Sequence, residues 1–307
     1  MAEPGNVARR CGFVALLGGP NVGKSTLLNR LVGTKVSIVT PKVQTTRRRI
    51  LGITVREDAQ LVFVDTPGIF VPRPGRRLEQ AMVQAAWRAV EDADLRVLVV
   101  DAKRGVKRDA ELILEGMRER RLEGSILALN KLDLVKPPST LPLIKQLDES
   151  GLFERIFIVS ALNGDGCDDL LEHLLRRLPE GPWLFPEDQL SDLSQRALAA
   201  EITREKLFRE LSQELPYSLT VETESWVESE DGREVRIDQT IYVQRDSQKA
   251  IVLGKGGRQI KQVGQAARAE LEQILGCRVH LFLFVKVRER WLDDPERYRE
   301  LGLDFPG

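Results

Sequence analysis

The chain of 307 residues has little of the chemistry on which many hydrolases depend, since it contains only two histidines and three cysteines. Zinc hydrolases and Ser/His or Cys/His nucleophilic enzymes need imidazole, whereas we expect ordinary structural roles for His173 and His280. Cys11, Cys167 and Cys277 lie far apart and share no CxxC spacing, which argues against disulfides and a thiolate metal site. Any catalysis must therefore manage without imidazole, and a reducing setting fits the chain.

Long apolar runs are also lacking. No stretch approaches the roughly 18 residues that a membrane-spanning helix needs, and MAEPGNVARR is not followed by an apolar segment of signal-peptide length. We therefore expect a cytoplasmic protein with no transmembrane segment. Hydrophobic residues at 42% and charged residues at 30% are typical of a soluble globular protein, and the length predicts two domains.

The chain has no net charge, but its charge is unevenly divided. Residues 1–185 carry 28 Lys and Arg against 23 Asp and Glu, and residues 186–307 carry 18 against 23. Within the acidic second half, the segment 245–268 holds six basic residues and one acid. For nucleic-acid binding, the local charge of a surface matters more than the net charge of the domain. The basic segment is therefore compatible with a nucleic-acid partner.

The first part of the chain alternates short β-rich runs with helical stretches, which predicts a mostly parallel sheet covered by helices. The exception is a pair of runs, 50–57 and 59–65, whose connection is too short for a helix and so predicts an antiparallel hairpin. We place an α/β domain in residues 1–180, an interdomain linker rich in proline in 181–193, and a smaller α+β domain in 194–307.

A glycine loop follows the first predicted strand and opens a helix, in the pattern GxxxxGKS. Such a loop turns its backbone N–H groups toward phosphate oxygens, and the helix N-terminus adds its positive dipole end. We expect Lys24 to reach the terminal phosphates and the Ser25 hydroxyl to coordinate Mg²⁺. The predicted phosphate-binding residues are Gly18, Gly19, Pro20, Asn21, Val22, Gly23, Lys24, Ser25 and Thr26.

Two further motifs narrow the nucleotide. Asp65-Thr66-Pro67-Gly68 ends a buried strand, which predicts a carboxylate in the Mg²⁺ shell and a glycine beside the γ-phosphate. Asn130-Lys131-Leu132-Asp133 follows another strand; Asp133 can accept two hydrogen bonds from the edge of guanine, which adenine does not offer. Ser160-Ala161-Leu162 would add backbone contacts to the same base. The sequence thus favours GTP over ATP.

In this order, GPNVGKS, a TTR segment, DTPG, NKLD and VSA resemble the five motifs of the translation-factor-related GTPases, and PKVQTTRRRI is similar to the Era-type members. The resemblance implies a P-loop GTPase domain that uses GTP, GDP and Mg²⁺, with Lys24, Thr46 and Gly68 as catalytic residues. Thr46 is the candidate switch threonine on Mg²⁺, and spacing alone leaves Thr45 as an alternative. The three arginines of 47–49 fit either phosphate or RNA contacts or an ordinary solvated segment.

The residue after Gly68 is Ile69, where other GTPases carry the glutamine that orients water. The resembling family shares this apolar residue, and several of its members recruit K⁺ through an asparagine that matches Asn21. We expect slow intrinsic hydrolysis stimulated by K⁺ or by RNA, while a purely bracing role for the Asn21 side chain stays open. A competing interpretation is an RNA-binding adaptor in which GTP is mainly structural.

The second half predicts a helix, a hairpin turning at Asp231-Gly232, then helix, GKGG loop, helix and strand. This order resembles a type II KH domain, whose glycine loop lets the backbone approach single-stranded RNA. A second nucleotide site is less favoured, since no GK[ST] stands there. We expect Ile251, Val252 and Leu253 to line or support an apolar groove. The expected RNA-binding residues are Ile251, Val252, Gly254, Lys255, Gly256, Gly257, Arg258 and Lys261.

The resemblance to the Era-type GTPases spans nearly the whole chain, including YVQRDSQKAIVLGKGG. It implies a role in assembly of the small ribosomal subunit, with the pre-ribosomal small subunit and the 3′ end of its ribosomal RNA as partners. It also implies peripheral association with the inner face of the cell membrane.

Overall fold

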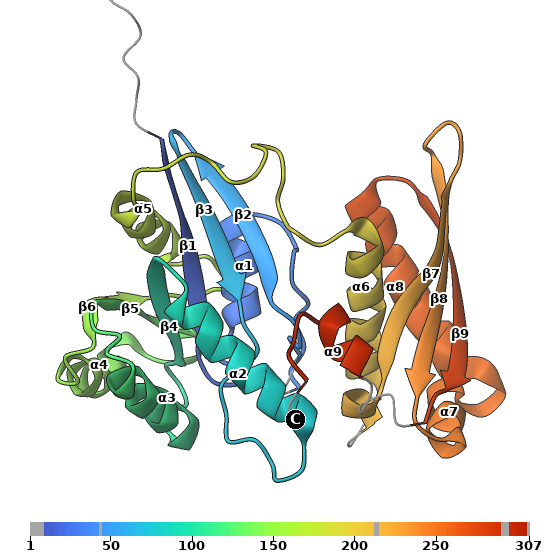
Figure 1. Cartoon of the computed structure of the whole chain (residues 1–307), viewed down its shortest axis with the longest axis horizontal. Coiled ribbons are helices and arrows are strands. Elements are labelled where there is room, and N and C mark those ends of the chain that lie inside the picture. Colours follow the sequence, from blue (N-terminus) through green and yellow to red (C-terminus); the bar gives the residue numbers. More distant parts are fainter. Residues whose placement is uncertain (1–8, 43–44, 212–214, 290–294, 306–307) are drawn as a thin grey trace, which may run out of the picture. The chain divides into compact units, whose positions relative to one another are not determined.

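The structure is a computed structural model that describes residues 9–42, 45–211, 215–289 and 295–305. These residues form two compact units. The first contains the described parts of Met1–Ser37, Thr46–Asp192 and Leu301–Gly307, and the second contains those of Ile38–Thr45 and Leu193–Glu300. Figure 1 shows the elements of both units in chain order.

The first unit is built on a six-stranded sheet in the order β2-β3-β1-β4-β5-β6. The hairpin of β2 and β3 is antiparallel and the other pairs are parallel, which confirms the predicted mostly parallel sheet. The strands are β1 (Arg10–Leu17), β2 (Ile50–Arg56), β3 (Ala59–Asp65), β4 (Leu95–Asp101), β5 (Ser125–Asn130) and β6 (Phe153–Ile158).

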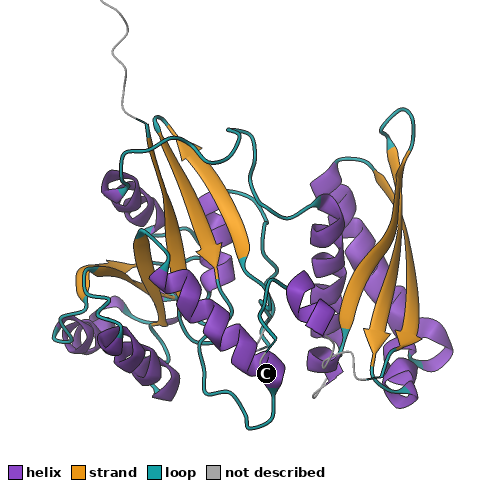
Figure 2. Cartoon of the chain, in the orientation of Figure 1, coloured by secondary structure: helices purple, strands orange, loops and turns teal. Residues whose placement is uncertain are grey.

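Helices cover both faces of this sheet (Figures 1 and 2). Alternate residues of a strand face opposite sides, so Val97 and Val99 of β4 join the core under α1 and α5, while Leu98 and Val100 join the core under α2 and α3. This explains why the central strands are continuously apolar rather than alternating. The helices are α1 (Lys24–Val32), α2 (Arg77–Glu91), α3 (Arg108–Glu119), α4 (Leu141–Asp148) and α5 (Cys167–Arg177).

The parallel strands bring the predicted motifs to one edge of the sheet. Because β1, β3, β4 and β5 run in the same direction, their carboxyl ends meet at that edge. The phosphate loop follows β1, Asp65 ends β3, Asp101 ends β4 and Asn130 ends β5. Segments that are more than a hundred residues apart in the chain therefore supply one site.

The second unit has the predicted order of helix, two strands, helix, glycine loop, helix and strand. Its sheet has the order β7-β8-β9, with β7 and β8 antiparallel and β8 and β9 parallel. Figure 2 shows α6 and α8 on one face of this sheet. The elements are α6 (Gln195–Glu210), β7 (Thr220–Glu228), β8 (Glu234–Val243), α7 (Asp246–Leu253), α8 (Arg258–Leu275), β9 (Arg278–Val287) and α9 (Pro295–Glu300).

The proline-rich segment expected to be a linker, 181–193, packs along the hairpin of the first unit. The Trp183 indole N–H donates to the carbonyl of Asp58 (3.2 Å), and the buried Gln60 side chain bonds the backbone of Leu184 and Phe185 (both 2.8 Å). The compact units divide between Asp192 and Leu193, at the end of this segment. It therefore adds a covering layer to the first unit before the chain passes into the second.

Candidate nucleotide site and candidate nucleic-acid interface

Glycine is required at two positions of the phosphate loop. Gly18 and Gly23 have φ of 153° and 102°, where L side chains are strained. A Cβ on Gly18 would meet the carbonyl oxygen of Val99 at 2.6 Å, and one on Gly23 would meet the Asn130 amide nitrogen at 2.3 Å. The loop thus packs against β4 and β5 more closely than any other residue type allows, and α1 begins directly after it.

The carbonyls of the phosphate loop are held by hydrogen bonds from neighbouring side chains. The Lys24 ammonium donates to the carbonyls of Gly18 (3.1 Å) and Gly19 (3.2 Å), and the Asn130 amide donates to that of Val22 (2.9 Å). In a planar trans peptide the N–H points opposite to the C=O. The Val22 carbonyl therefore points toward Asn130, and the next N–H, that of Gly23, points away from Asn130.

Lys24 is buried, with 7% of its surface exposed. Desolvation lowers the pKa of its ammonium from 10.5 to about 8, and the nearby Asp65 carboxylate only partly opposes this effect. An ammonium in so dry a position gains more from a polyphosphate than an exposed lysine would, because its charge is less screened.

Three hydroxyls surround the Asp65 carboxylate, which is fully buried. Its Oδ2 accepts from Ser25 (2.7 Å), Ser37 (2.9 Å) and Thr46 (3.3 Å), and the Ser25 and Thr46 hydroxyls lie 3.1 Å apart. Its Oδ1 has no hydrogen-bond partner among the described residues. Burial raises the pKa of this carboxyl, against the lowering effects of Lys24 and the hydroxyls.

This oxygen cluster fits Mg²⁺, which takes hard oxygen ligands and only one or two carboxylates. The unpartnered Oδ1 of Asp65 is the observation that favours the ion, because a buried carboxylate oxygen without a partner is costly. Among the described residues no three His, Cys, Asp or Glu side chains gather as a metal site. A hydroxyl-rich magnesium site beside phosphates is therefore the metal chemistry that these residues support.

The two candidate switch threonines differ in their surroundings. Thr46 lies at the Asp65 cluster and is 6% exposed. The Thr45 hydroxyl instead bonds the Thr40 hydroxyl (2.6 Å) and the carbonyl of Lys42 (2.8 Å). The geometry thus favours Thr46 over the alternative that spacing left open.

The DTPG segment lies against the phosphate loop. A Cβ on Gly68 would meet the Pro20 nitrogen at 3.0 Å, and the Ile69 N–H donates to the carbonyl of Gly18 (3.1 Å). The Thr66 hydroxyl bonds the carbonyl of Leu16 (2.9 Å). The Ile69 side chain is fully buried in the core beneath α2 and α3, so the residue in the glutamine position does not reach a catalytic water.

The segment 130–133, which is predicted to select guanine, is held by hydrogen bonds to two neighbouring loops. The Ser160 hydroxyl donates to Asp133 Oδ1 (2.6 Å), and the Ala161 N–H donates to Asn130 Oδ1 (2.9 Å). Lys131, at a φ of 67°, donates to the carbonyl of Asn21 (2.6 Å). Ala161 was expected to offer its backbone to the base, but here its N–H is used by Asn130; Leu162 is 68% exposed.

The second glycine loop has an open surface. Gly254, Gly256 and Gly257 all have φ between 61° and 75°, and a Cβ on Gly256 or Gly257 would meet nothing within 4 Å. The side chains of Lys255, Arg258 and Lys261 are exposed beside it. Backbone and positive charge are therefore both accessible here, as RNA phosphates require.

The apolar residues before this loop divide into one outside and one inside. Ile251 is 52% exposed on α7, next to the loop, whereas Val252 is fully buried in the core of the second unit. Val252 is consequently a core residue and cannot contact RNA directly. Ile251 is the residue whose surface a base could contact.

Comparison with known proteins gives the family. A family model described as "50S ribosome-binding GTPase" matches residues 13–131, and one described as "KH domain" matches residues 214–292. GTPase Era of Sinorhizobium medicae is 59% identical over 300 residues, covering 98% of this chain and 96% of its own length. GTPase Era of Brucella suis is 58% identical over 297 residues, covering 97% and 94%. This chain belongs to the Era family of GTPases.

Solved Era structures share the fold. Era in complex with MgGDPNP and nucleotides 1506–1542 of 16S ribosomal RNA is 41% identical with a TM-score of 0.89, covering 96% of this chain and 99% of its own. A variant of Aquifex aeolicus Era bound to GDP and AlF₄⁻ is 40% identical with a TM-score of 0.89, covering 95% and 99%. The expected architecture, a P-loop GTPase domain followed by a KH domain, is confirmed, and this Era-family chain is a GTPase.

Sequence motifs missed several residues that shape the Era-family site. Ser37 reaches Asp65, and it is placed there by Asn29 of α1, whose side-chain oxygen accepts the N–H groups of Val36 and Ser37 (both 2.9 Å). Arg30 donates to the carbonyl of Ala161 (3.3 Å). None of these residues belongs to a recognised motif, so only their contacts reveal them.

Among the described helices, none combines the length and apolarity that a membrane span needs.

Proposed function

We propose that this Era-family GTPase binds GTP and GDP with Mg²⁺ at the edge of the first sheet and binds the 3′-terminal RNA of the small ribosomal subunit through its KH domain. The observation that carries the nucleotide part is the buried Asp65 carboxylate, with one oxygen held by three hydroxyls and the other unpartnered. Mg²⁺ would be held by Ser25, Thr46 and Asp65, and it supplies charge neutralisation at the β- and γ-phosphates when bound.

The phosphates would lie on the N–H groups of residues 18–26, with Lys24 on the terminal phosphates and the Gly68 N–H beside the γ-phosphate. Guanine would lie between Lys131 and the backbone at residues 160–162. Its N1–H and N2–H₂ groups would donate hydrogen bonds to the Asp133 carboxylate. Ser160 orients that carboxylate for the base (2.6 Å). Adenine would leave Asp133 unpaired, which is the basis for discrimination.

The residue at the glutamine position is Ile69, whose apolar side chain is buried in the core, so another group would orient the water that attacks the γ-phosphate. We propose that K⁺ contributes here through Asn21, which stands in the phosphate loop at a φ of 61°. Positive charge at this place would stabilise the transition state as an arginine finger does.

For the RNA part, the support is the accessible GKGG loop flanked by Lys255, Arg258 and Lys261 and by the exposed Ile251. The related Era was solved with nucleotides 1506–1542 of 16S ribosomal RNA. We propose the same 3′-terminal region as the ligand here, and the pre-ribosomal small subunit as the larger partner. Peripheral association with the cell membrane is a further proposal, which rests on the family resemblance. If the protein did not float with lipid vesicles at physiological salt, this proposal would fail.

The test is single-turnover hydrolysis of GTP, with and without an RNA oligonucleotide of the 3′-terminal small-subunit sequence, in KCl and in NaCl. We expect slow hydrolysis in NaCl, faster hydrolysis in KCl, and a further increase with RNA but not with a scrambled oligonucleotide. Equal rates in the two salts would remove the K⁺ proposal alone. Rates that RNA does not alter would favour an RNA-binding adaptor in which GTP is mainly structural.

A further inference from the structure

Two cationic side chains, outside the phosphate loop in sequence, donate hydrogen bonds to its backbone carbonyls. Arg104 Nη1 donates to the carbonyl of Pro20 (3.2 Å), and Lys131 Nζ donates to the carbonyl of Asn21 (2.6 Å). These are consecutive carbonyls at the tip of the loop. Because each peptide is planar and trans, fixing them fixes the N–H directions of Asn21 and Val22.

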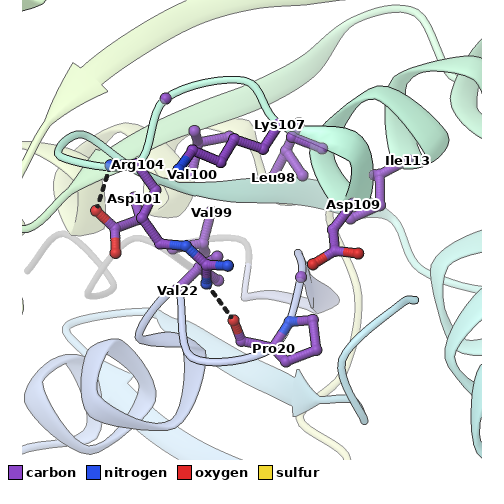
Figure 3. Close-up of a pocket in the computed structure, with 13 residues that line it drawn as sticks. Pro20, Val22, Leu98, Val99, Val100, Asp101, Arg104, Lys107, Asp109 and Ile113 are labelled. Atoms are coloured by element: carbon purple, nitrogen blue, oxygen red, sulfur yellow. Dashed lines mark hydrogen bonds between the residues drawn. The ribbon is translucent and has the colours of Figure 1, made fainter. Parts of the chain in front are cut away.

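Both cations are organised by one carboxylate, that of Asp101 at the end of β4, which is 5% exposed. Its Oδ2 pairs with Lys131 Nζ at 2.7 Å. Its Oδ1 accepts the backbone N–H groups of Lys103 (2.9 Å) and Arg104 (3.1 Å), which shapes the turn that carries Arg104. Figure 3 shows Asp101 and Arg104 in this arrangement, with Arg104 reaching Pro20.

Packing on this side of the loop is incomplete. A pocket lies between the loop, β4 and α3, lined by Pro20, Val22, Leu98, Asp109 and Ile113 among others (Figure 3). Apolar contacts are therefore incomplete behind Pro20, and hydrogen bonds carry a larger share of the restraint. A loop that must not reorganise when phosphate arrives binds more tightly than a loose one.

We infer that Asp101 is a positioning residue for nucleotide binding. Its carboxylate orients Lys131 and the Arg104 turn, and these two cations hold the loop so that its N–H groups face the phosphates. The inference deepens the proposed function and rests on it. It assigns to the end of β4 a part in affinity for GTP and GDP alike, since both share the phosphates that the loop would bind, and no part in choosing guanine.

The test compares the intact chain with Asp101→Asn, which can still accept the two turn N–H groups but loses the charge facing Lys131. We expect the dissociation constants for fluorescent GDP and a GTP analogue to rise together by about tenfold, the size of a charge-assisted hydrogen bond. KM for GTP should rise with kcat unchanged, because slow chemistry makes KM follow binding. Preference for guanine over xanthine nucleotides should stay the same.

The matched control is Asp109→Asn, an acid that lines the same pocket and has no hydrogen bond to either cation among the described residues; we expect unchanged affinity. Arg104→Ala should weaken binding by about threefold, as one backbone hydrogen bond would. In a Lys131→Met background, Asp101→Asn should add little to the loss.

An undiminished effect of Asp101→Asn in that background, together with a lower melting temperature, would show that Asp101 only stabilises the fold and would overturn the inference. So would an Asp101→Asn variant that binds as the intact chain does. If the intact chain itself bound neither GDP nor GTP, the proposed function would fail instead, and the two failures are distinct.

Discussion

At the scale of single residues, the site depends on charged groups that are kept dry. Lys24 and Asp65 are both almost fully removed from solvent, and burial lowers the pKa of the lysine to about 8 and raises that of the aspartate. Each shift disfavours the charged form in the free protein. In the complex, phosphate would stabilise the Lys24 ammonium and Mg²⁺ would stabilise the Asp65 carboxylate. The charged forms of both residues are therefore more favourable in the complex than in the free protein.

This predicts a pH dependence of GTP binding. Below pH 8 the Lys24 ammonium is already protonated, and above it the free protein must take up a proton to bind, so the association constant should fall by up to about tenfold per pH unit. Calorimetry from pH 7 to 9 in buffers of different ionisation enthalpy measures both the affinity and the proton uptake. In Lys24→Met the affinity should be low and the proton uptake absent. Constant affinity over this range in the intact chain would contradict the assignment.

At the scale of elements, each of the two glycine loops connects two elements, and its glycines have a definite structural role. In the phosphate loop, Gly18 and Gly23 allow close packing on β4 and β5. In the KH loop, Gly256 and Gly257 face open space, so there the glycines serve access from outside. The same residue type thus has two different structural reasons in one chain.

The open surface at Gly256 predicts a clean loss of RNA binding in Gly256→Asp. A Cβ at this position would meet no protein atom within 4 Å, and the new carboxylate would repel RNA phosphates, so we expect affinity for the 3′-terminal oligonucleotide to fall about tenfold or more. Gly276→Asp is the matched control, because Gly276 ends α8 at a φ of 66° and also faces open space. Filter binding or fluorescence anisotropy measures the effect. Equal losses in both variants would point to backbone strain and not to an RNA contact at the loop.

At the scale of the whole molecule, two units with separate hydrophobic cores divide the work. The first unit has cores on both faces of its sheet, and the second has cores between its sheet and helices α6 and α8. The phosphate loop, Thr46 and the DTPG, NKLD and 160–162 segments lie in the first unit, and the expected RNA-binding residues of 251–261 lie in the second. Each activity can therefore be perturbed by itself.

This division predicts two thermal unfolding transitions. GDP with Mg²⁺ should raise the midpoint temperature of one transition and leave the other unchanged. At a free GDP concentration of a hundred times the dissociation constant, the free energy of unfolding of the binding unit should increase by about 2.7 kcal/mol. ADP at the same concentration is the control and should shift neither. Differential scanning calorimetry makes the measurement. A single transition that moves as a whole with GDP would show instead that the two cores unfold cooperatively.

The sequence by itself determined the family, the order of the elements and the motif residues, because glycine spacing, apolar strands and the DTPG and NKLD motifs are local features. What only the tertiary structure decided are the contacts made between distant segments. No motif contains Ser37, Asp101 or Arg104, although they contact Asp65, Lys131 and Pro20 respectively. Thr45 and Thr46 have different surroundings, although their positions in the sequence fit the motif equally well. The physical reason is that parallel strands bring loops of remote sequence to one edge, where which side chain meets which is settled by packing and not by the neighbours in the chain.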